Sequence, residues 1–207
     1  MTHDNAEAYE RERDIVLHDL AQLHEDQWAH PSLCPGWDVR DVAAHLLMPF
    51  ELGVAGLFGR MFAARFNFDR LALRWARNDR RTPAELLRAL AATSTEAFNV
   101  PGAGPLAPLC HLTIHAYDFR GPLNIDTPIS PDAARPVLDD ITGGKHAVPA
   151  ALLAGLRLEA ADAAWSFGQG RQVLGPAGAL MSALSGRASA VEKLVGDGTG
   201  SLRSRLG

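Results

Sequence analysis

Hydrophobic and polar positions follow a helical period over residues 5–27. The apolar side chains recur among charged residues at Tyr9, Val16, Leu20 and Leu23. Spacing of this kind predicts an amphipathic helix that buries one face. The prolines and the glycine within residues 31–36 then break the pattern, so we expect the helix to end before them.

A second helix is predicted to begin near Val39. Asp38, followed by Asp41 ahead of an apolar run, is typical of an N-cap with an acidic residue three positions later. His45 shares a face of this helix with apolar residues. We therefore expect His45 to point into the apolar side, where a lone histidine usually serves as a hydrogen-bonded core residue.

Further helical segments are predicted between residues 69 and 124. Residues 69–78 form a short helix or helical connection, and residues 82–85 (Thr-Pro-Ala-Glu) start a helix that runs to about Phe98. The glycine- and proline-rich residues 101–105 end it, and Pro108 can open the next helix. Four main helices with such connections predict an antiparallel bundle, in which sites lie in the core between facing helices.

The pattern changes after Pro122 and predicts a second, smaller domain. A short helix is expected from residue 130 to the glycine pair at 143–144. Residues 156–160 alternate apolar and polar positions, and Trp165 and Phe167 repeat this pattern, which predicts a β-hairpin. Two helices are expected over residues 177–194. The fold class is therefore mainly α, with a helix bundle over residues 1–124 and a small α+β domain over residues 125–207.

Composition indicates a globular protein of a reducing compartment. The chain has 207 residues, of which 47% are hydrophobic, and its longest apolar stretch, residues 46–62, is too interrupted to span a membrane. The polar N-terminus lacks an apolar signal core, so a cytoplasmic location is expected. Two cysteines, Cys34 and Cys110, cannot build a disulfide framework. A net charge of −4 argues against nucleic acid as a partner.

Three histidines form a candidate metal site. His111 and His115 are four residues apart, so both imidazoles lie on one face of a helix, about one turn apart. His45 is a third candidate ligand. Catalytic zinc uses three protein ligands and one open position. Eight histidines also produce such pairs by chance, and Cys110 is either a further ligand or a buried apolar residue.

Several motifs resemble one known family. Residues 31–46 (PSLCPGWDVRDVAAHL) are similar to the N-terminal signature of the mycothiol-dependent maleylpyruvate isomerase family, which belongs to the wider DinB-like metalloenzyme bundles. The resemblance continues at residues 111–118, where the family has a ligand, three residues, a histidine, two residues and an aspartate. The tail also resembles such proteins, at residues 165–168, 175–177, 183–187 and 194–198.

The resemblance implies a DinB-like four-helix bundle in which His45, His111 and His115 bind a divalent metal, with zinc favoured. It also implies mycothiol as a thiol cosubstrate. The isomerases resembled usually have glutamate where this chain has His111, whereas three histidines are common among other DinB-like bundles. A neutral imidazole in place of a carboxylate makes the site more positive by one charge and favours an anionic fourth ligand such as a thiolate.

Two further residues are candidates for supporting roles. Asp118 lies three residues after His115 and is expected to accept the second ring proton of a ligand histidine. The alternatives are a cap or an ion pair with Arg120, or direct metal ligation. Arg187, which follows Gly186 at a helix break, is a candidate contact for a carboxylate of the substrate or thiol, with plain surface exposure as its alternative.

These observations favour an enzyme. The preferred hypothesis is a mycothiol-dependent metalloenzyme, of the isomerase or S-transferase type, that acts on a small electrophilic metabolite through a metal-bound thiolate. One alternative is a metal-dependent hydrolase that uses metal-bound hydroxide, since zinc lowers the pKa of bound water to about 7. Another is a non-catalytic metal- or small-molecule-binding protein. The expected partners are a small-molecule substrate and a low-molecular-weight thiol, with neither nucleic acid nor membrane; the sequence does not determine the oligomeric state.

Overall fold

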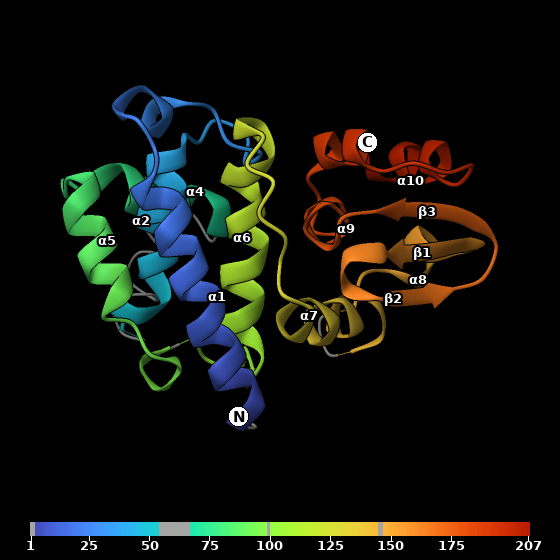
Figure 1. The fold of residues 1–207 in the computed structure, drawn as a ribbon, viewed down its shortest axis with the longest axis horizontal. Helices are drawn as coiled ribbons and strands as arrows, with labels where there is room; N and C mark the ends of the chain where they lie inside the picture. Colours follow the sequence, from blue (N-terminus) through green and yellow to red (C-terminus); the bar gives the residue numbers. More distant parts are fainter. Residues whose placement is uncertain (1–2, 54–66, 99, 145–146) are drawn as a thin grey trace. The chain divides into compact units, whose positions relative to one another are not determined.

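The computed structural model describes residues 3–53, 67–98, 100–144 and 147–207, and it is mainly helical with one small sheet (Figure 1). The chain divides into two compact units, Met1–Leu112 and Thr113–Gly207. The first unit contains α1 (His3–Ala21), η1 (Glu25–Ala29), α2 (Val39–Glu51), α4 (Phe68–Asn78), α5 (Pro83–Ala91), η2 (Thr95–Ala97) and the start of α6 (Ala107–Leu123). The second contains the rest of α6, then α7 (Pro131–Gly143), α8 (Ala150–Leu153), β1 (Leu156–Ala160), η3 (Ala161–Ala163), β2 (Trp165–Gly168), β3 (Arg171–Gly175), α9 (Ala177–Leu184), η4 (Ala188–Lys193) and α10 (Thr199–Leu206).

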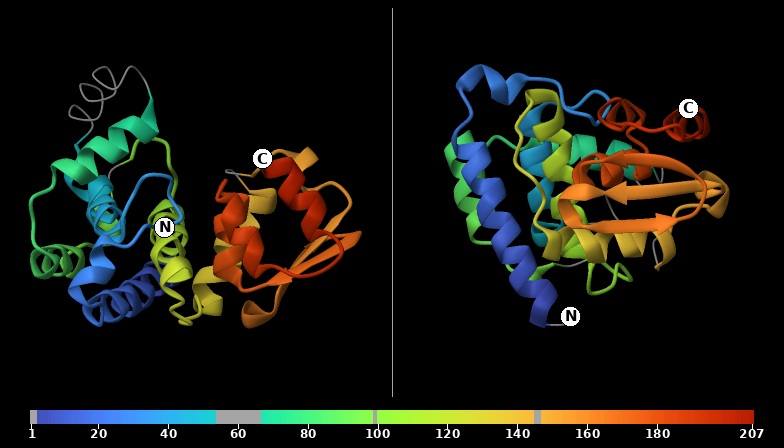
Figure 2. Two further views of the ribbon diagram at one scale, coloured as in Figure 1. Left: turned by 90° about the horizontal axis from the view of Figure 1, so that it is seen from above. Right: turned by 45° about the vertical axis from the view of Figure 1, so that its right-hand side comes forward.

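Helix α2 is the central helix of the first unit. It packs against α4 and α5, and α1 packs against α5 (Figure 2). Nearly all of α2 between Val39 and Pro49 is buried. An apolar cluster that joins α2 to α4 consists of Met48, Leu52, Leu71 and Ala72, with Trp37 and Trp75 packed against it. This burial stabilises α2 and positions its buried side chains.

The predicted helix starts of the first unit are confirmed. The Asp38 carboxylate accepts a hydrogen bond of 2.7 Å from the Asp41 N–H, which caps α2. Thr82 caps α5, and the Glu85 carboxylate in turn accepts from the Thr82 N–H at 2.7 Å. Such reciprocal bonds satisfy backbone donors that have no partner within the helix. These local rules therefore fixed where α2 and α5 begin.

Two predicted helix ends are wrong. The first helix ends at Ala21 and not at residue 27, because the N–H groups of residues 22 and 23 bond three residues back and a short 3₁₀ turn follows. Helix α5 ends at Ala91 and not at Phe98. There the N–H and the hydroxyl of Thr93 both donate to the carbonyl of Leu90, at 3.1 and 2.7 Å. In a continuing α-helix this carbonyl would instead accept from the N–H four residues later, so these bonds end the helix.

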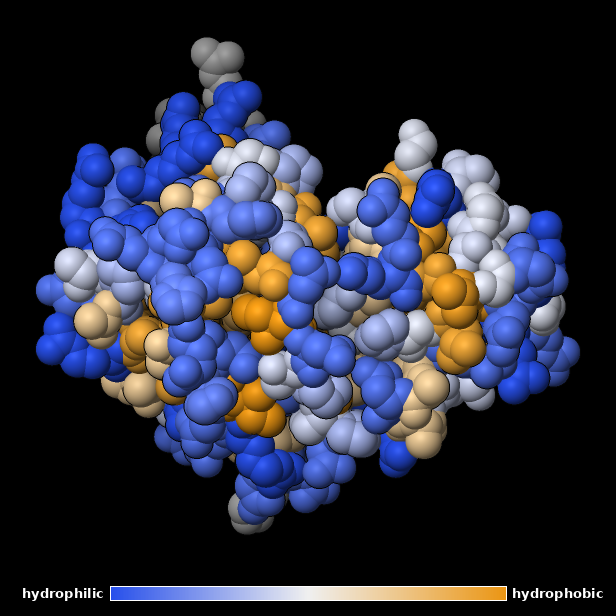
Figure 3. Space-filling model, turned by 45° about the horizontal axis from the view of Figure 1, so that its top comes forward, coloured by the Kyte–Doolittle hydropathy of each residue, from blue (hydrophilic) through white to orange (hydrophobic). Residues whose placement is uncertain are grey.

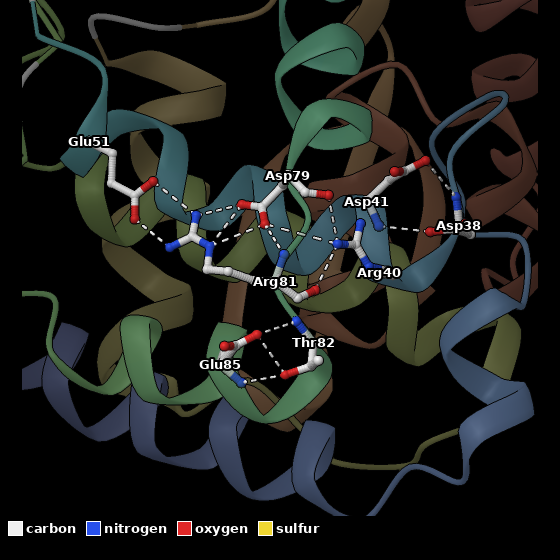
Figure 4. A network of polar contacts seen from close by, with 8 residues as sticks. All are labelled: Asp38, Arg40, Asp41, Glu51, Asp79, Arg81, Thr82 and Glu85. Atoms are coloured by element: carbon white, nitrogen blue, oxygen red, sulfur yellow. Dashed lines mark hydrogen bonds and ion pairs between the residues drawn. The ribbon is translucent and has the colours of Figure 1, made fainter.

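A network of charged side chains connects α2 to the segment between α4 and α5 (Figure 4). The Arg81 guanidinium contacts both carboxylate oxygens of Asp79 and, at 2.6 and 2.9 Å, those of Glu51 at the end of α2. From the start of α2, Arg40 donates to the backbone carbonyls of Asp79 and Arg81, at 2.8 Å each. The two ends of α2 are thus tied to one connecting segment.

This network makes stability depend on pH through Asp79. Burial of the Asp79 carboxylate alone would raise its pKa, but the hydrogen bonds and charge of Arg81 and the charge of Arg40 outweigh burial and hold the pKa below its usual value. The stabilisation is therefore present above the ordinary aspartate pKa of about 3.9 and is lost as the pH falls through the lower folded-state pKa. We expect Asp79→Asn to cost about 1.5–3 kcal/mol at neutral pH, as for hydrogen bonds to a charged group.

Urea unfolding at pH 7 and at successively lower pH tests this expectation. The difference in free energy of unfolding between the wild type and Asp79→Asn should begin to shrink as the pH falls below about 4, where Asp79 of the unfolded chain takes up a proton. It should disappear as the pH falls through the lower folded-state pKa of Asp79. Glu10→Gln is the control, since it removes an exposed carboxylate from α1. A difference that stays constant down to the acid transition would contradict the assigned role of the Asp79 charge.

The second unit contains a three-stranded sheet in the order β2-β1-β3. Strands β1 and β2 are antiparallel, with Leu158 opposite Phe167, which confirms the predicted hairpin. Strand β3 was not predicted; it pairs parallel to β1, with Leu158 opposite Val173. Residues 171–175 lack the alternation of a half-buried strand, so their sequence gave no signal. Helix α9 packs against β1 and α7.

The helices observed after the sheet differ in part from the predicted ones. Helix α9 is confirmed, but the segment that follows it is the 3₁₀ helix η4 and not an α-helix. Helices α8 and α10 were not predicted. Gly196, with φ at 111°, precedes α10 and lies so close to the Gln172 carbonyl that a Cβ would be 2.3 Å from its oxygen. Only glycine allows this approach.

Polar side chains cover most of the face that Figure 3 shows, with smaller apolar areas between them. Among the described residues, every helix is too short or too polar to cross a membrane. The apolar stretch at residues 46–62 lies partly outside the described residues. The domain boundary predicted between residues 124 and 125 would keep α6 whole, and it stays a prediction.

Candidate metal centre

His45 is presented by the buried face of α2. Its side chain is 3% exposed, which confirms the predicted orientation toward the apolar side. The Trp37 ring meets the imidazole edge-on, with the ring centres 4.9 Å apart. Because Trp37 immediately precedes the N-cap Asp38, the start of α2 places both the tryptophan and the helix that carries His45. The imidazole is therefore held between an aromatic wall and the helix core.

His111, near the start of α6, faces His45 in the first unit. Their Nε2 atoms are 3.3 Å apart, and the ring centres 4.9 Å. The Phe98 ring lies edge-on to His111 with its centre at 6.1 Å. Two nitrogens that each lie 2.0–2.1 Å from one tetrahedral zinc ion would be roughly 3.3 Å apart. The separation of the two Nε2 atoms therefore fits a shared metal ion.

His115 follows His111 by one turn of the same continuous helix. The spacing of four residues alone places the two imidazoles on one side of α6. His45, His111 and His115 are a set of side chains that could hold a metal ion. The Nδ1 atom of His115 is 2.8 Å from Oδ2 of Asp118, so a metal bound by this ring would be ligated through Nε2. All three histidines would then ligate through Nε2.

Asp118 is a fully buried carboxylate at the centre of a polar cluster in the second unit. Arg187 contacts both of its oxygens, with Nε 3.1 Å from Oδ1 and Nη2 2.9 Å from Oδ2. The Ser182 hydroxyl donates to Oδ1 at 3.3 Å. Burial alone would raise the pKa of Asp118, but the hydrogen bonds and charges of His115 and Arg187 hold the pKa well below its usual range. The carboxylate is therefore an ionised acceptor for the His115 ring.

The structure thus brings the predicted site residues into two local groups joined by α6. The hydrogen bond predicted between Asp118 and a candidate ligand histidine is present, and it involves His115. Asp118 forms an ion pair with Arg187, and the alternative of a pair with Arg120 stays a prediction. Arg187 is 18% exposed at its side chain, and its contact with a substrate or thiol stays a prediction.

Sequence reasoning missed Ser182. This residue is fully buried in α9, a helix whose other residues are apolar or glycine, and its hydroxyl reaches Asp118. A single hydroxyl inside an apolar helix was the available signal, because a buried polar group requires a hydrogen-bond partner. Nothing in the sequence indicated which partner it would be.

Comparison with known proteins agrees with these observations. The family model of the mycothiol maleylpyruvate isomerase N-terminal domain matches residues 9–116. A crystal structure of the mycothiol-dependent maleylpyruvate isomerase is similar with a TM-score of 0.52 and 16% identity, over 93% of this chain and 91% of that chain. The structure of a histidine-to-alanine mutant of that isomerase gives a TM-score of 0.53 and 15% identity, with the same coverage.

No curated protein matches the chain. At 15–16% identity, the structural likeness shows the fold, a DinB-like helix bundle followed by a small α+β part. The family model covers more than half of the sequence, including the α2 segment and both histidines of α6. The chain therefore belongs to the family defined by the mycothiol maleylpyruvate isomerase N-terminal domain.

Proposed function

We propose that this protein is a metal-dependent and mycothiol-dependent enzyme, of the isomerase or S-transferase type, that acts on a small electrophilic metabolite. The observation that carries the proposal is the opposed pair of Nε2 atoms of His45 and His111, 3.3 Å apart, with His115 on the next turn of α6. Family membership supplies the choice of thiol and the isomerase chemistry.

The donor set favours zinc. Imidazole nitrogens suit Zn²⁺, and three protein ligands are typical of its catalytic sites. His111 is neutral where the isomerases resembled usually have a glutamate, so the three ligands leave the full double charge of the cation uncompensated. When bound, such an ion would act as a Lewis acid that favours the thiolate form of a small thiol.

The residues of the chain itself would provide position and shielding. His45 is held by the buried α2, and its ring edge packs against Trp37. Phe98 lies against His111, so an aromatic ring packs against each member of the histidine pair. Asp118 holds the Nδ1 side of His115. An apolar, pre-organised surrounding strengthens electrostatic interactions and limits the access of water to a reactive thiolate.

The first experiment is elemental mass spectrometry of the purified, tag-free protein. We expect about one zinc ion per chain. No bound metal, even after incubation with divalent cations and removal of excess, would contradict the proposed centre.

Thiol dependence is then measured on the metal-loaded protein with small electrophiles such as cis-configured unsaturated dicarbonyl compounds. We expect turnover only with mycothiol or another low-molecular-weight thiol present. Turnover of ester substrates without any thiol would contradict the proposed reaction and support a hydrolase. Metal binding without turnover under any of these conditions would support a binding protein.

A further inference from the structure

We infer that Arg187 is a positioning residue, which orients Asp118 so that its carboxylate keeps the ring proton of His115 on Nδ1 and not on Nε2, the nitrogen that would ligate. The inference rests on the proposed function in one respect, namely that His115 is a metal ligand. The contacts that carry the inference lie within the second unit. They join η4 and α9 to the part of α6 that carries His115.

The contact between Arg187 and Asp118 fixes the carboxylate in two directions. Nε and Nη2 of the guanidinium meet Oδ1 and Oδ2, respectively, at 3.1 and 2.9 Å. A two-point contact of this kind defines the plane of the carboxylate as well as its position, which a single ammonium group does not. Because Oδ2 also lies 2.8 Å from Nδ1 of His115, the same geometry sets where the imidazole must present its N–H.

Arg187 is itself held on several sides. Its Nη1 donates to the carbonyl of Ser185 at 2.7 Å, and its backbone N–H donates to the carbonyl of Ser182 at 3.0 Å. The Ser182 side chain completes the arrangement by donating to Oδ1 of Asp118 at 3.3 Å. Gly186, with φ at 92°, provides the left-handed turn after α9 that directs Arg187 back toward the carboxylate.

The consequence concerns the tautomer of His115. A neutral imidazole carries its proton on one nitrogen only, and the nitrogen that carries it cannot bind a metal. Asp118 is 0% exposed, so the orientation of its carboxylate depends on neighbouring protein groups. Without Arg187, the carboxylate loses the partner that sets its plane, and the preference for the proton on Nδ1 weakens. Arg187 thereby influences which nitrogen of His115, on α6, carries the proton.

The test compares Arg187→Gln and Arg187→Lys with the wild type. The control is Arg157→Gln, since Arg157 is half-exposed and pairs only locally with Glu159 among the contacts described here. In metal-free protein with ¹⁵N-labelled histidine, long-range ¹H–¹⁵N spectra at alkaline pH report which nitrogen of each ring carries the proton. We expect His115 to carry it on Nδ1 in the wild type and in Arg157→Gln. Both Arg187 variants should shift His115 toward the form protonated on Nε2, and lysine should not restore the wild-type spectrum.

Zinc affinity is a second readout, obtained by competition with a chromophoric chelator. We expect the Arg187 variants to bind zinc 10–100-fold more weakly than the wild type, as is typical when an outer-shell partner of a ligand histidine is lost. An unchanged His115 spectrum in folded Arg187→Gln would overturn the inference. So would full recovery of spectrum and affinity by lysine, because a charge without fixed geometry would then suffice.

The two readouts separate this inference from the proposed function. If the wild type binds no metal but its His115 tautomer depends on Arg187, the proposed function fails and the positioning role stands. If metal binds and the tautomer does not respond, the positioning role fails alone. Ser182→Ala, which removes one small donor to Asp118, gives the same spectral comparison should Arg187→Gln not fold. A smaller shift in the same direction is expected, and no shift would contradict the inference.

Discussion

Replacing His45 with alanine is expected to lower zinc affinity by at least about 100-fold, which is the upper end of the loss seen when only an outer-shell partner of a ligand is removed. The physical reason is that, in the proposed centre, His45 would supply one of three ligand nitrogens; its Nε2 lies 3.3 Å from that of His111. Thiol-dependent turnover should disappear with the metal. Metal content after dialysis and affinity by chelator competition measure the effect.

Control variants make this result interpretable. His18→Ala removes an exposed histidine from α1 and should leave metal content unchanged. His45→Gln keeps a polar side chain of similar size in the buried position, so it separates loss of a ligand from loss of packing. His111→Glu should retain metal, because a carboxylate is also a zinc ligand and would match the residue usual in the isomerases resembled. Full metal content in folded His45→Ala would show that the three-histidine assignment is wrong.

Asp118→Asn is expected to destabilise the metal-free protein by about 3–5 kcal/mol, the cost of breaking a buried ion pair by removing one partner. Asp118 is fully buried, and the side chain of Arg187 is 18% exposed, so a value near the lower end is expected. The asparagine amide has one acceptor oxygen, so it cannot replace the two carboxylate oxygens that meet the guanidinium and His115. Urea unfolding in the presence of a chelator measures this free energy without a contribution from metal binding.

A double-mutant cycle tests whether the loss belongs to the ion pair. Asp118→Asn combined with Arg187→Gln should be less destabilised than the sum of the two single variants, because the second change removes the guanidinium that the first left without its carboxylate. Additive losses would mean that the two residues contribute independently. A cost below about 1 kcal/mol for Asp118→Asn alone, the range of exposed ion pairs, would contradict its assignment as a buried pair.

Prediction from sequence succeeded where the physical cause is local. The caps at Asp38 and Thr82 act within one helical turn, so neighbouring residues alone determine where α2 and α5 begin. The hairpin of β1 and β2 is likewise local. Strand β3 was missed because it is held by parallel pairing to β1 and by the bridge between Leu174 and Val195, neither of which produces a pattern in its own residues.

The candidate site divides in the same way. The sequence by itself determined that His111 and His115 share a face of one helix and that Asp118 is within reach of His115, because helical periodicity fixes these relations. Only the tertiary structure decided that His45 faces His111, since α2 and α6 are far apart in the sequence. It also decided that Arg187 and Ser182 meet Asp118, because bringing residues about 65 positions apart to one buried carboxylate depends on packing of the whole second unit.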